Sequence, residues 1–175
     1  QLAFGIRSLL FTVLRDPERT ESAANQLYGV ASGSFYTYLR FFYGPSAAQQ
    51  FSNLLTDYIT SMWRVFREVG SSSYNQGPDS NTTSLYSSAD QVAAYLADLN
   101  VYWSEQQWQS FFYQLTQLEI QEAVTLASKD FDGEYQLYQR IVDLAILMGD
   151  YMARGIIASS SVPAIPAVPA GPQGA

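Results

Sequence analysis

The stretch FSNLLTDYITSMWRVFREV, residues 51–69, has the clearest helical pattern in the chain. Its apolar residues recur at intervals of three and four, namely Phe51, Leu54, Leu55, Tyr58, Ile59, Met62, Phe66 and Val69. Such spacing places these side chains on one face of an α-helix, and polar residues fill most of the positions between them. The stretch therefore predicts a long amphipathic helix with one buried face.

Apolar residues at helical spacing also occur on both sides of this stretch. They predict further helices over residues 2–15, 17–42, 88–99, 104–128 and 134–158. We find no run that alternates like a β-strand. The sequence thus predicts an all-α protein, an antiparallel helical bundle of four main helices plus short connecting helices. The bundle is expected to span residues 1–158, followed by an extended tail, 159–175.

The expected helix boundaries rest on local chemistry. Proline disfavours a helical conformation in the residue before it, so breaks are expected before Pro17 and at Gly44-Pro45. The polar residues 70–84 predict a loop, and Asp132-Gly133 is expected to separate the last two helices. Ser104, with Gln107 three residues later, has the pattern of a helix N-cap. Gly29 and Gly33 indicate either a closely approaching neighbour or a bend.

The composition excludes several function classes. The chain has 175 residues, a net charge of −7 and only 9 lysines and arginines, too few for binding to nucleic acid along its phosphates. It contains no cysteine and no histidine, which excludes thiolate chemistry and the commonest acid–base group. Charged residues make up only 14% of the chain. A surface with so little charge resists association poorly, so contact between copies is expected.

The N-terminal region bears on location. The sequence begins with Gln1 rather than methionine, and we interpret this as the removal of a secretory signal. No apolar run reaches the roughly 18 residues that a membrane-spanning helix needs. Residues 2–14 are apolar but interrupted by Arg7, which indicates a buried helix rather than one lying on a membrane. We therefore expect a protein that is secreted or at the cell surface, without a membrane span.

Two acidic residues lie on the apolar side of a predicted helix. Glu119 and Glu122 share the face that carries Trp108 and Leu126. One interpretation, which we favour, is a pair of carboxyl groups held by Arg7 or Arg40 and by tyrosine hydroxyls. The other is a metal site of Glu119, Glu122 and Asp150. Without histidine, its oxygen ligands would suit a hard divalent cation such as Ca²⁺ or Mg²⁺.

The C-terminal sequence SVPAIPAVPAGPQGA, residues 161–175, has a period of three. Its prolines are Pro163, Pro166, Pro169 and Pro172, and Ile165 and Val168 share a second edge of the repeat. Polyproline II has three residues per turn and rises ~3.1 Å per residue, so a rod of about 30 Å is predicted. An uncharged rod of this kind is expected to dock in a groove by its Ile165–Val168 edge. We favour a groove on a neighbouring subunit over one on the same bundle.

Four segments carry a resemblance to a known family: FFYGPSAAQQFSNLLTDYI (41–59), LYSSADQVAAYLADLNVYW (85–103), EAVTLA (122–127) and LMGDYMARGII (147–157). They resemble segments of a family of uncharacterised helical proteins from spore-forming Gram-positive bacteria. The resemblance covers residues 40–157 and implies a helical bundle without naming an activity. Some members are labelled acetylglutamate kinase, but this chain has no phosphate-binding loop. It also lacks the histidines of the family's first and last helices, which removes any metal or acid–base role that they imply.

These observations favour a non-enzymatic, secreted structural subunit. We expect it to assemble with itself into a filament, tube or surface layer, with the tail docked on a neighbouring subunit. Such non-closing contacts between identical subunits build open assemblies. One alternative is the carboxylate-rich metal-binding bundle described above. A second is the coat protein of a filamentous virus, although an acidic subunit is poorly suited to wrapping a genome directly.

Overall fold

The computed structural model describes residues 1–71 and 79–160, and these residues are helices and turns without a strand. The predicted all-α class is confirmed. The elements are α1 (Leu2–Arg15), η1 (Pro17–Arg19), α2 (Thr20–Gly29), η2 (Val30–Phe35), α3 (Tyr36–Val69), α4 (Ser80–Leu99), α5 (Glu105–Ala127) and α6 (Phe131–Ser160). Element η1 is a 3-10 turn and η2 is π-helical. The predicted tail lies outside the described residues, except that α6 continues through Ser160.

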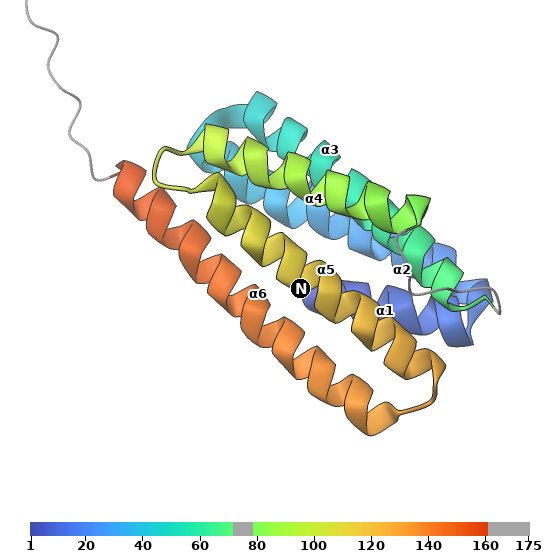
Figure 1. The fold of residues 1–175 in the computed structure, drawn as a ribbon. Coiled ribbons are helices and arrows are strands. Elements are labelled where there is room, and N and C mark those ends of the chain that lie inside the picture. The colour runs from blue at the N-terminus through green and yellow to red at the C-terminus, as the bar shows by residue number, and fades with distance from the viewer. Residues whose placement is uncertain (72–78, 161–175) are drawn as a thin grey trace, which may run out of the picture.

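The helices lie lengthwise beside one another (Figure 1). Helix α3 packs along α4, α4 along α5, and α5 along α6, while α1 packs on α2 and α3. Helix α6 has its main contact with α5 and a smaller one with α1. It therefore lies at an edge of the bundle, which matters for the groove described below (Figure 1).

The core confirms the helix predicted over residues 51–69. Phe51, Leu55, Tyr58, Ile59, Met62, Phe66 and Val69 are all buried. They meet the buried residues of α1, α4 and α5, including Trp108. At roughly 1.5–3 kcal/mol for each large apolar side chain, this shared core is the main source of stability. The N-terminal helix is buried along one face as well, through Ile6, Leu9 and Leu10.

The predicted break at Gly44-Pro45 is confirmed, although helix α3 continues on both sides of it. Gly44 has φ 84° and ψ 171°, a backbone conformation that residues other than glycine rarely adopt. The chain folds back on itself here, because Phe35 packs against Phe51 with ring centroids 5.7 Å apart. Further along the same hairpin, the Tyr28 hydroxyl lies 3.1 Å from Thr60 Oγ1. Gly44 is thus the turn of a helical hairpin.

The prediction of a loop over residues 70–84 is wrong at its C-terminal end, because α4 begins at Ser80. Asp79 caps the helix, and its Oδ1 accepts the Thr82 N–H at 2.7 Å. The hydroxyls of Thr83 and Ser84 donate to the carbonyls of Asp79 and Ser80. The serine and threonine hydroxyls therefore find hydrogen-bond acceptors within the helix itself. A segment whose composition is typical of loops is helical for this reason.

Two further local predictions are corrected. Helix α6 begins at Phe131, so Asp132-Gly133 lies inside it; the break falls instead at Lys129, which has φ 67°. Asp130 explains the earlier start, because its Oδ1 accepts the Gly133 N–H at 2.9 Å. At Gly29 and Gly33 an added Cβ would meet nothing within 4 Å. No neighbour approaches them closely, and the helix widens into the π-helical η2 instead.

The last helix has two apolar faces, and the bundle covers only one of them. Its inner face packs through Ile141 and Leu144, which are buried. Val142, Ile146 and Leu147 are the apolar residues of the other side. Ile146 is 60% and Leu147 53% exposed, so the bundle leaves this face open. The reason is the position of α6 at the edge, beside α5 and little else.

Within residues 1–71 and 79–160, no helix has both the length and the apolar character needed to cross a bilayer.

Candidate functional site

Four helices bring a buried carboxyl cluster together. Glu119 and Glu122 from α5 are 0% and 1% exposed, and Glu134 from the first turn of α6 is 2% exposed. Arg7 of α1 donates to Glu134 through Nε at 2.6 Å and Nη2 at 2.9 Å. Its Nε also lies 3.6 Å from Glu122 Oε1. Of the two predicted arginine partners, Arg7 is therefore the one at the cluster, and Arg40 is exposed.

Tyrosine hydroxyls take part as predicted. The hydroxyl of Tyr58 on α3 lies 2.9 Å from Thr116 Oγ1 and donates to Glu119 Oε2 at 3.5 Å. The ring of Tyr138 packs over the Arg7 guanidinium, with 4.4 Å between Cζ and the ring centroid. The cluster thus joins α1, α3, α5 and α6, and many of its polar atoms are hydrogen-bonded to one another. Glu119 Oε1 and Glu122 Oε1 have no hydrogen-bond partner.

Burial dominates the electrostatics of the two predicted glutamates. Loss of water raises the pKa of Glu119 well above its usual range, and the neighbouring Glu122 raises it further. Burial, followed by the contact with Glu134, raises the pKa of Glu122 to about 8 even though Arg7 opposes the shift. Both shifts favour the protonated form of the carboxyl group. Arg7 is paired with the third member, Glu134, by two hydrogen bonds.

The residues of this cluster do not fit the predicted metal site. Asp150, the expected third ligand, is exposed on α6, whereas Glu119 and Glu122 are buried. Among the described residues, no group of three or more acidic side chains is arranged to hold a metal ion. Arg7 already lies beside both Glu122 and Glu134. Buried carboxyl groups paired with an arginine form a structural arrangement in the core.

Glu134 is the member of the cluster that sequence reasoning missed. It was placed at the start of the last helix, where an acidic residue is common because it favours the positive end of the helix dipole. Nothing in the local pattern marks it as buried. Its role depends on Arg7, which lies 127 residues away in the chain.

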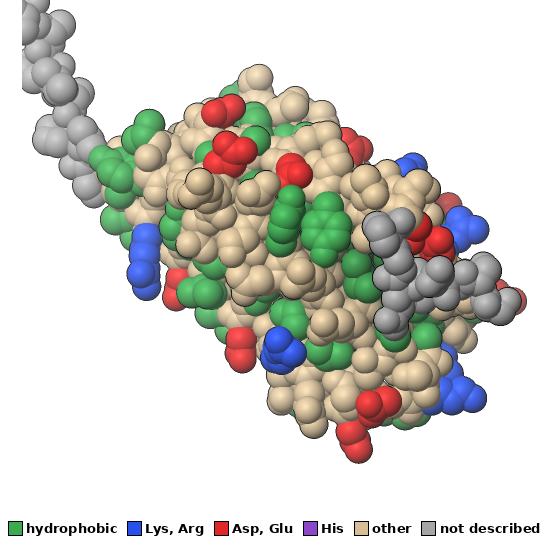
Figure 2. Space-filling view, viewed as in Figure 1, with side chains coloured by type: hydrophobic (Ala, Val, Ile, Leu, Met, Phe, Trp, Pro, Cys, Tyr) green, Lys and Arg blue, Asp and Glu red, His purple; other side chains and the backbone are tan. Residues whose placement is uncertain are grey.

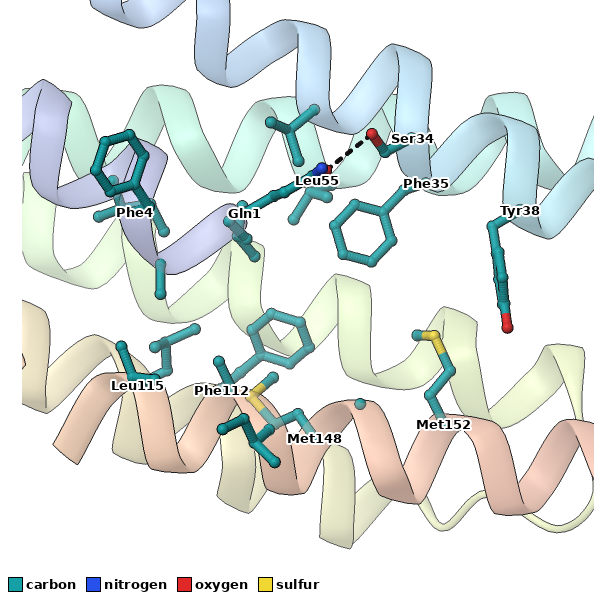
Figure 3. A pocket seen from close by; sticks show the side chains of 18 of the residues that line it. Gln1, Phe4, Ser34, Phe35, Tyr38, Leu55, Phe112, Leu115, Met148 and Met152 are labelled. Carbon is teal, nitrogen blue, oxygen red and sulfur yellow. Dashed lines mark hydrogen bonds between the residues drawn. The ribbon is translucent and has the colours of Figure 1, made fainter. Parts of the chain in front are cut away.

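An apolar groove of about 630 Å³ is the other candidate site. It lies between α6 and the layer formed by α1, η2 and the beginning of α3. Phe35 and Tyr38 face it from one side and Met148 and Met152 of α6 from the other, and Phe112 and Leu115 of α5 also line it (Figure 3). Among the described residues that line it, no side chain is charged. Such a surface suits an uncharged, apolar occupant.

The open face of α6 forms one wall of this groove. Val142, Ala145, Ile146, Gly149 and Ala153 all line it. An added Cβ at Gly149 would meet nothing within 4 Å, so the wall is open there rather than filled by a neighbouring helix. At the opposite rim, Gln1 accepts a hydrogen bond from the Ser34 hydroxyl at 3.0 Å (Figure 3). The groove is therefore an extended opening between two walls held by separate helices.

Exposed apolar residues also gather at the end of the bundle where α6 ends. Val101 and Tyr102 in the α4–α5 turn are 91% and 46% exposed, and Ile157 of α6 is 64% exposed. Tyr43, beside the Gly44 turn, accepts a hydrogen bond from Asn100 Nδ2 at 2.7 Å, which brings the aromatic residues before the turn to this same end. Of these, Phe41 is 83% exposed. Figure 2 shows hydrophobic side chains gathered at this end, with acidic and basic side chains nearby on the same face.

The predicted assembly residues Pro163, Ile165, Pro166, Val168, Pro169 and Pro172 lie outside the described residues. Their docking stays a prediction. Comparisons of the chain with protein-family models, with curated proteins and with solved structures find no match. The resemblance to the family of helical proteins from spore-forming bacteria thus also stays a prediction.

Proposed function

We propose that this protein is a structural subunit that assembles with copies of itself. The observation that carries the proposal is the uncovered apolar face of α6, with Ile146 and Leu147 more than half exposed beside an uncharged groove. Contiguous apolar surface of this kind is typical of protein–protein contacts. A location outside the cell and a polymeric assembly are part of the same proposal and rest on the sequence.

Two further features support contact between copies. The surface is poor in charge, because only 14% of residues are charged and several of these are engaged in ion pairs. The apolar end with Phe41, Val101 and Ile157 is distinct from the groove, so one subunit offers two separate surfaces. Two different surfaces on one subunit allow head-to-tail contacts, which propagate when they do not close into a ring.

The test is the association state of the full chain in solution. Sedimentation velocity over a range of concentrations, followed by negative-stain microscopy, should detect oligomers or filaments. The double variant Ile146→Lys and Leu147→Lys places two charges on the uncovered face and should weaken association at least about tenfold, because lysine resists burial in an apolar contact.

A matched control adds the same charges to the same helix. Gln136 and Gln139 are exposed residues of α6 outside the groove lining, so Gln136→Lys with Gln139→Lys should leave association nearly unchanged. A full chain that stays monomeric at every concentration would rule out the proposed function. Equal weakening by both double variants would show that net charge, rather than the α6 face, controls association.

A further inference from the structure

We infer that the groove beside α6 is the receptor for the C-terminal segment 162–172 of a neighbouring copy. This inference rests on the proposed self-assembly and names the contact that would produce it. Two features of the same chain carry the inference. One is a groove lined by aromatic and uncharged side chains, and the other is an uncharged C-terminal segment with proline at every third position.

The chemistry of the two surfaces matches. Polyproline II segments are recognised by grooves lined with aromatic side chains, which pack against the flat proline rings. Phe35, Tyr38, Phe112 and Tyr138 contribute aromatic surface to this groove. Burial of a charged segment here would be costly, whereas residues 161–174 carry no charge at all. The groove therefore favours this segment over the charged surfaces of the bundle.

The dimensions also match. The residues of α6 that line the groove run from Tyr138 to Ala153, which corresponds to about 23 Å at ~1.5 Å per helical residue. The repeat from Pro163 to Pro172 would extend for about 30 Å as polyproline II. One segment can therefore cover the length of the α6 wall, with Ile165 and Val168 on a common edge.

The end of α6 directs the chain away from the groove of its own molecule. Ser159 and Ser160 donate their hydroxyls to the carbonyl of Ile156 at 2.9 and 2.8 Å, and both remain helical. The last α6 residue that lines the groove is Ala153, so the helix continues for about 10 Å beyond it. Docking on the same molecule would need an immediate reversal after Ser160, and a neighbouring copy needs none. We therefore assign the contact to a neighbour.

The experiment uses two complementary variants of the full chain. In the tail variant, Ile165→Asp and Val168→Asp place charges on the edge that docks. In the groove variant, Gly149→Glu places a charge in the receptor wall. Gly149 is exposed with open space beside it, and glutamate has a higher helix propensity than glycine, so this variant should fold. Each variant alone should associate at least about a hundredfold more weakly than the unmodified chain.

The decisive sample is an equimolar mixture of the two variants. The groove variant still has an intact segment 162–172 and the tail variant still has an intact groove. Sedimentation velocity should therefore show a 1:1 complex in the mixture and monomers in each separate sample. Matched controls carry the same charges elsewhere: Ala164→Asp with Ala167→Asp on another edge of the repeat, and Gln136→Glu outside the groove lining. Both should associate like the unmodified chain.

The possible results distinguish the inferred contact between groove and tail from the proposed self-assembly. If the unmodified chain associates but the variants do so equally well, the inferred contact is wrong while self-assembly stands. If each variant is monomeric and the mixture still forms no complex, the segment 162–172 does not dock in the groove of a neighbouring copy. A tail variant that melts at a lower temperature as a monomer, with association intact, would show docking on the same molecule. If the unmodified chain is monomeric throughout, the proposed function itself is wrong.

Discussion

At the scale of single residues, the carboxyl cluster shows how burial decides what an acidic side chain does. Glu119 and Glu122 face the core, where a charge would lose its hydration, so the protonated form is favoured. Glu134 instead accepts a hydrogen bond from the Arg7 guanidinium on each of its two oxygens. The same residue type thus has two different surroundings within one cluster.

These states predict the pH dependence of stability. The pKa of Glu122 is raised from its ordinary value of 4.5 to about 8, so the folded chain holds a proton that the unfolded chain releases. The contribution of Glu122 is present in full below about pH 4.5 and is lost as the pH rises towards 8. For one such proton the free energy of unfolding falls by up to about 1.4 kcal/mol per pH unit in this window. Urea denaturation at a series of pH values measures this slope.

Variants identify the group responsible. Glu122→Gln keeps the shape of the neutral acid but cannot ionise, so the loss of stability between about pH 5 and pH 8 should become shallower. Asp150→Asn changes an exposed carboxyl group and serves as the control, with the slope of the unmodified chain. Stability that rises over this pH range in the unmodified chain would contradict the assignment of a buried, protonated Glu122.

At the scale of elements, Gly44 adopts a backbone conformation that would strain any other residue type. Its φ of 84° with ψ 171° allows the helical hairpin between α2 and the long part of α3. Gly44→Ala is therefore expected to lower the free energy of unfolding by about 1–3 kcal/mol through backbone strain alone, because the space beside it is open. Urea denaturation measures this loss directly.

Gly29 provides the matched control for this substitution. It is helical, with φ −61° and ψ −28°, and also has open space beside it. Gly29→Ala should raise stability by roughly 0.5–1 kcal/mol, since alanine loses less backbone entropy on folding than glycine. Effects of the same sign at the two positions would show that backbone conformation does not explain the Gly44 result.

The elements also show where sequence reasoning succeeds and where it fails. The hairpin break at Gly44-Pro45 and the cap at Ser104, whose Oγ accepts the Gln107 N–H at 3.3 Å, were predicted correctly. Both depend on residues that lie within three positions of each other in the chain. The start of α4 was missed because Thr83 and Ser84 have the composition of a loop. Their hydroxyls bond to carbonyls one turn earlier, a compensation that appears only once the helix exists.

At the scale of the whole molecule, the proposed self-assembly has a characteristic salt dependence. Each copy carries a net charge of −7, so copies repel one another at low ionic strength. The groove and the uncovered face of α6 are apolar, and burial of apolar surface is not weakened by screening. Raising NaCl from about 0.02 M to 0.5 M should therefore strengthen association, by roughly twofold to tenfold.

Light scattering at fixed protein concentration follows this change. A contact built on ion pairs would weaken over the same range, because screening reduces the attraction between opposite charges. Association that falls with added salt would thus exclude the apolar surfaces as the main contact and point to the charged residues of the bundle instead.

The sequence by itself determined the helical class, most helix boundaries and the apolar faces, including the buried face of residues 51–69. These properties follow from spacing of 3.6 residues per turn and from glycine, proline and capping chemistry, all of which act within a few residues. Only the tertiary structure decided that Arg7 pairs with Glu134, and that α6 leaves Ile146 exposed beside a groove. Both depend on how distant helices pack, because a side chain's partner is set by the neighbouring helix and not by its own.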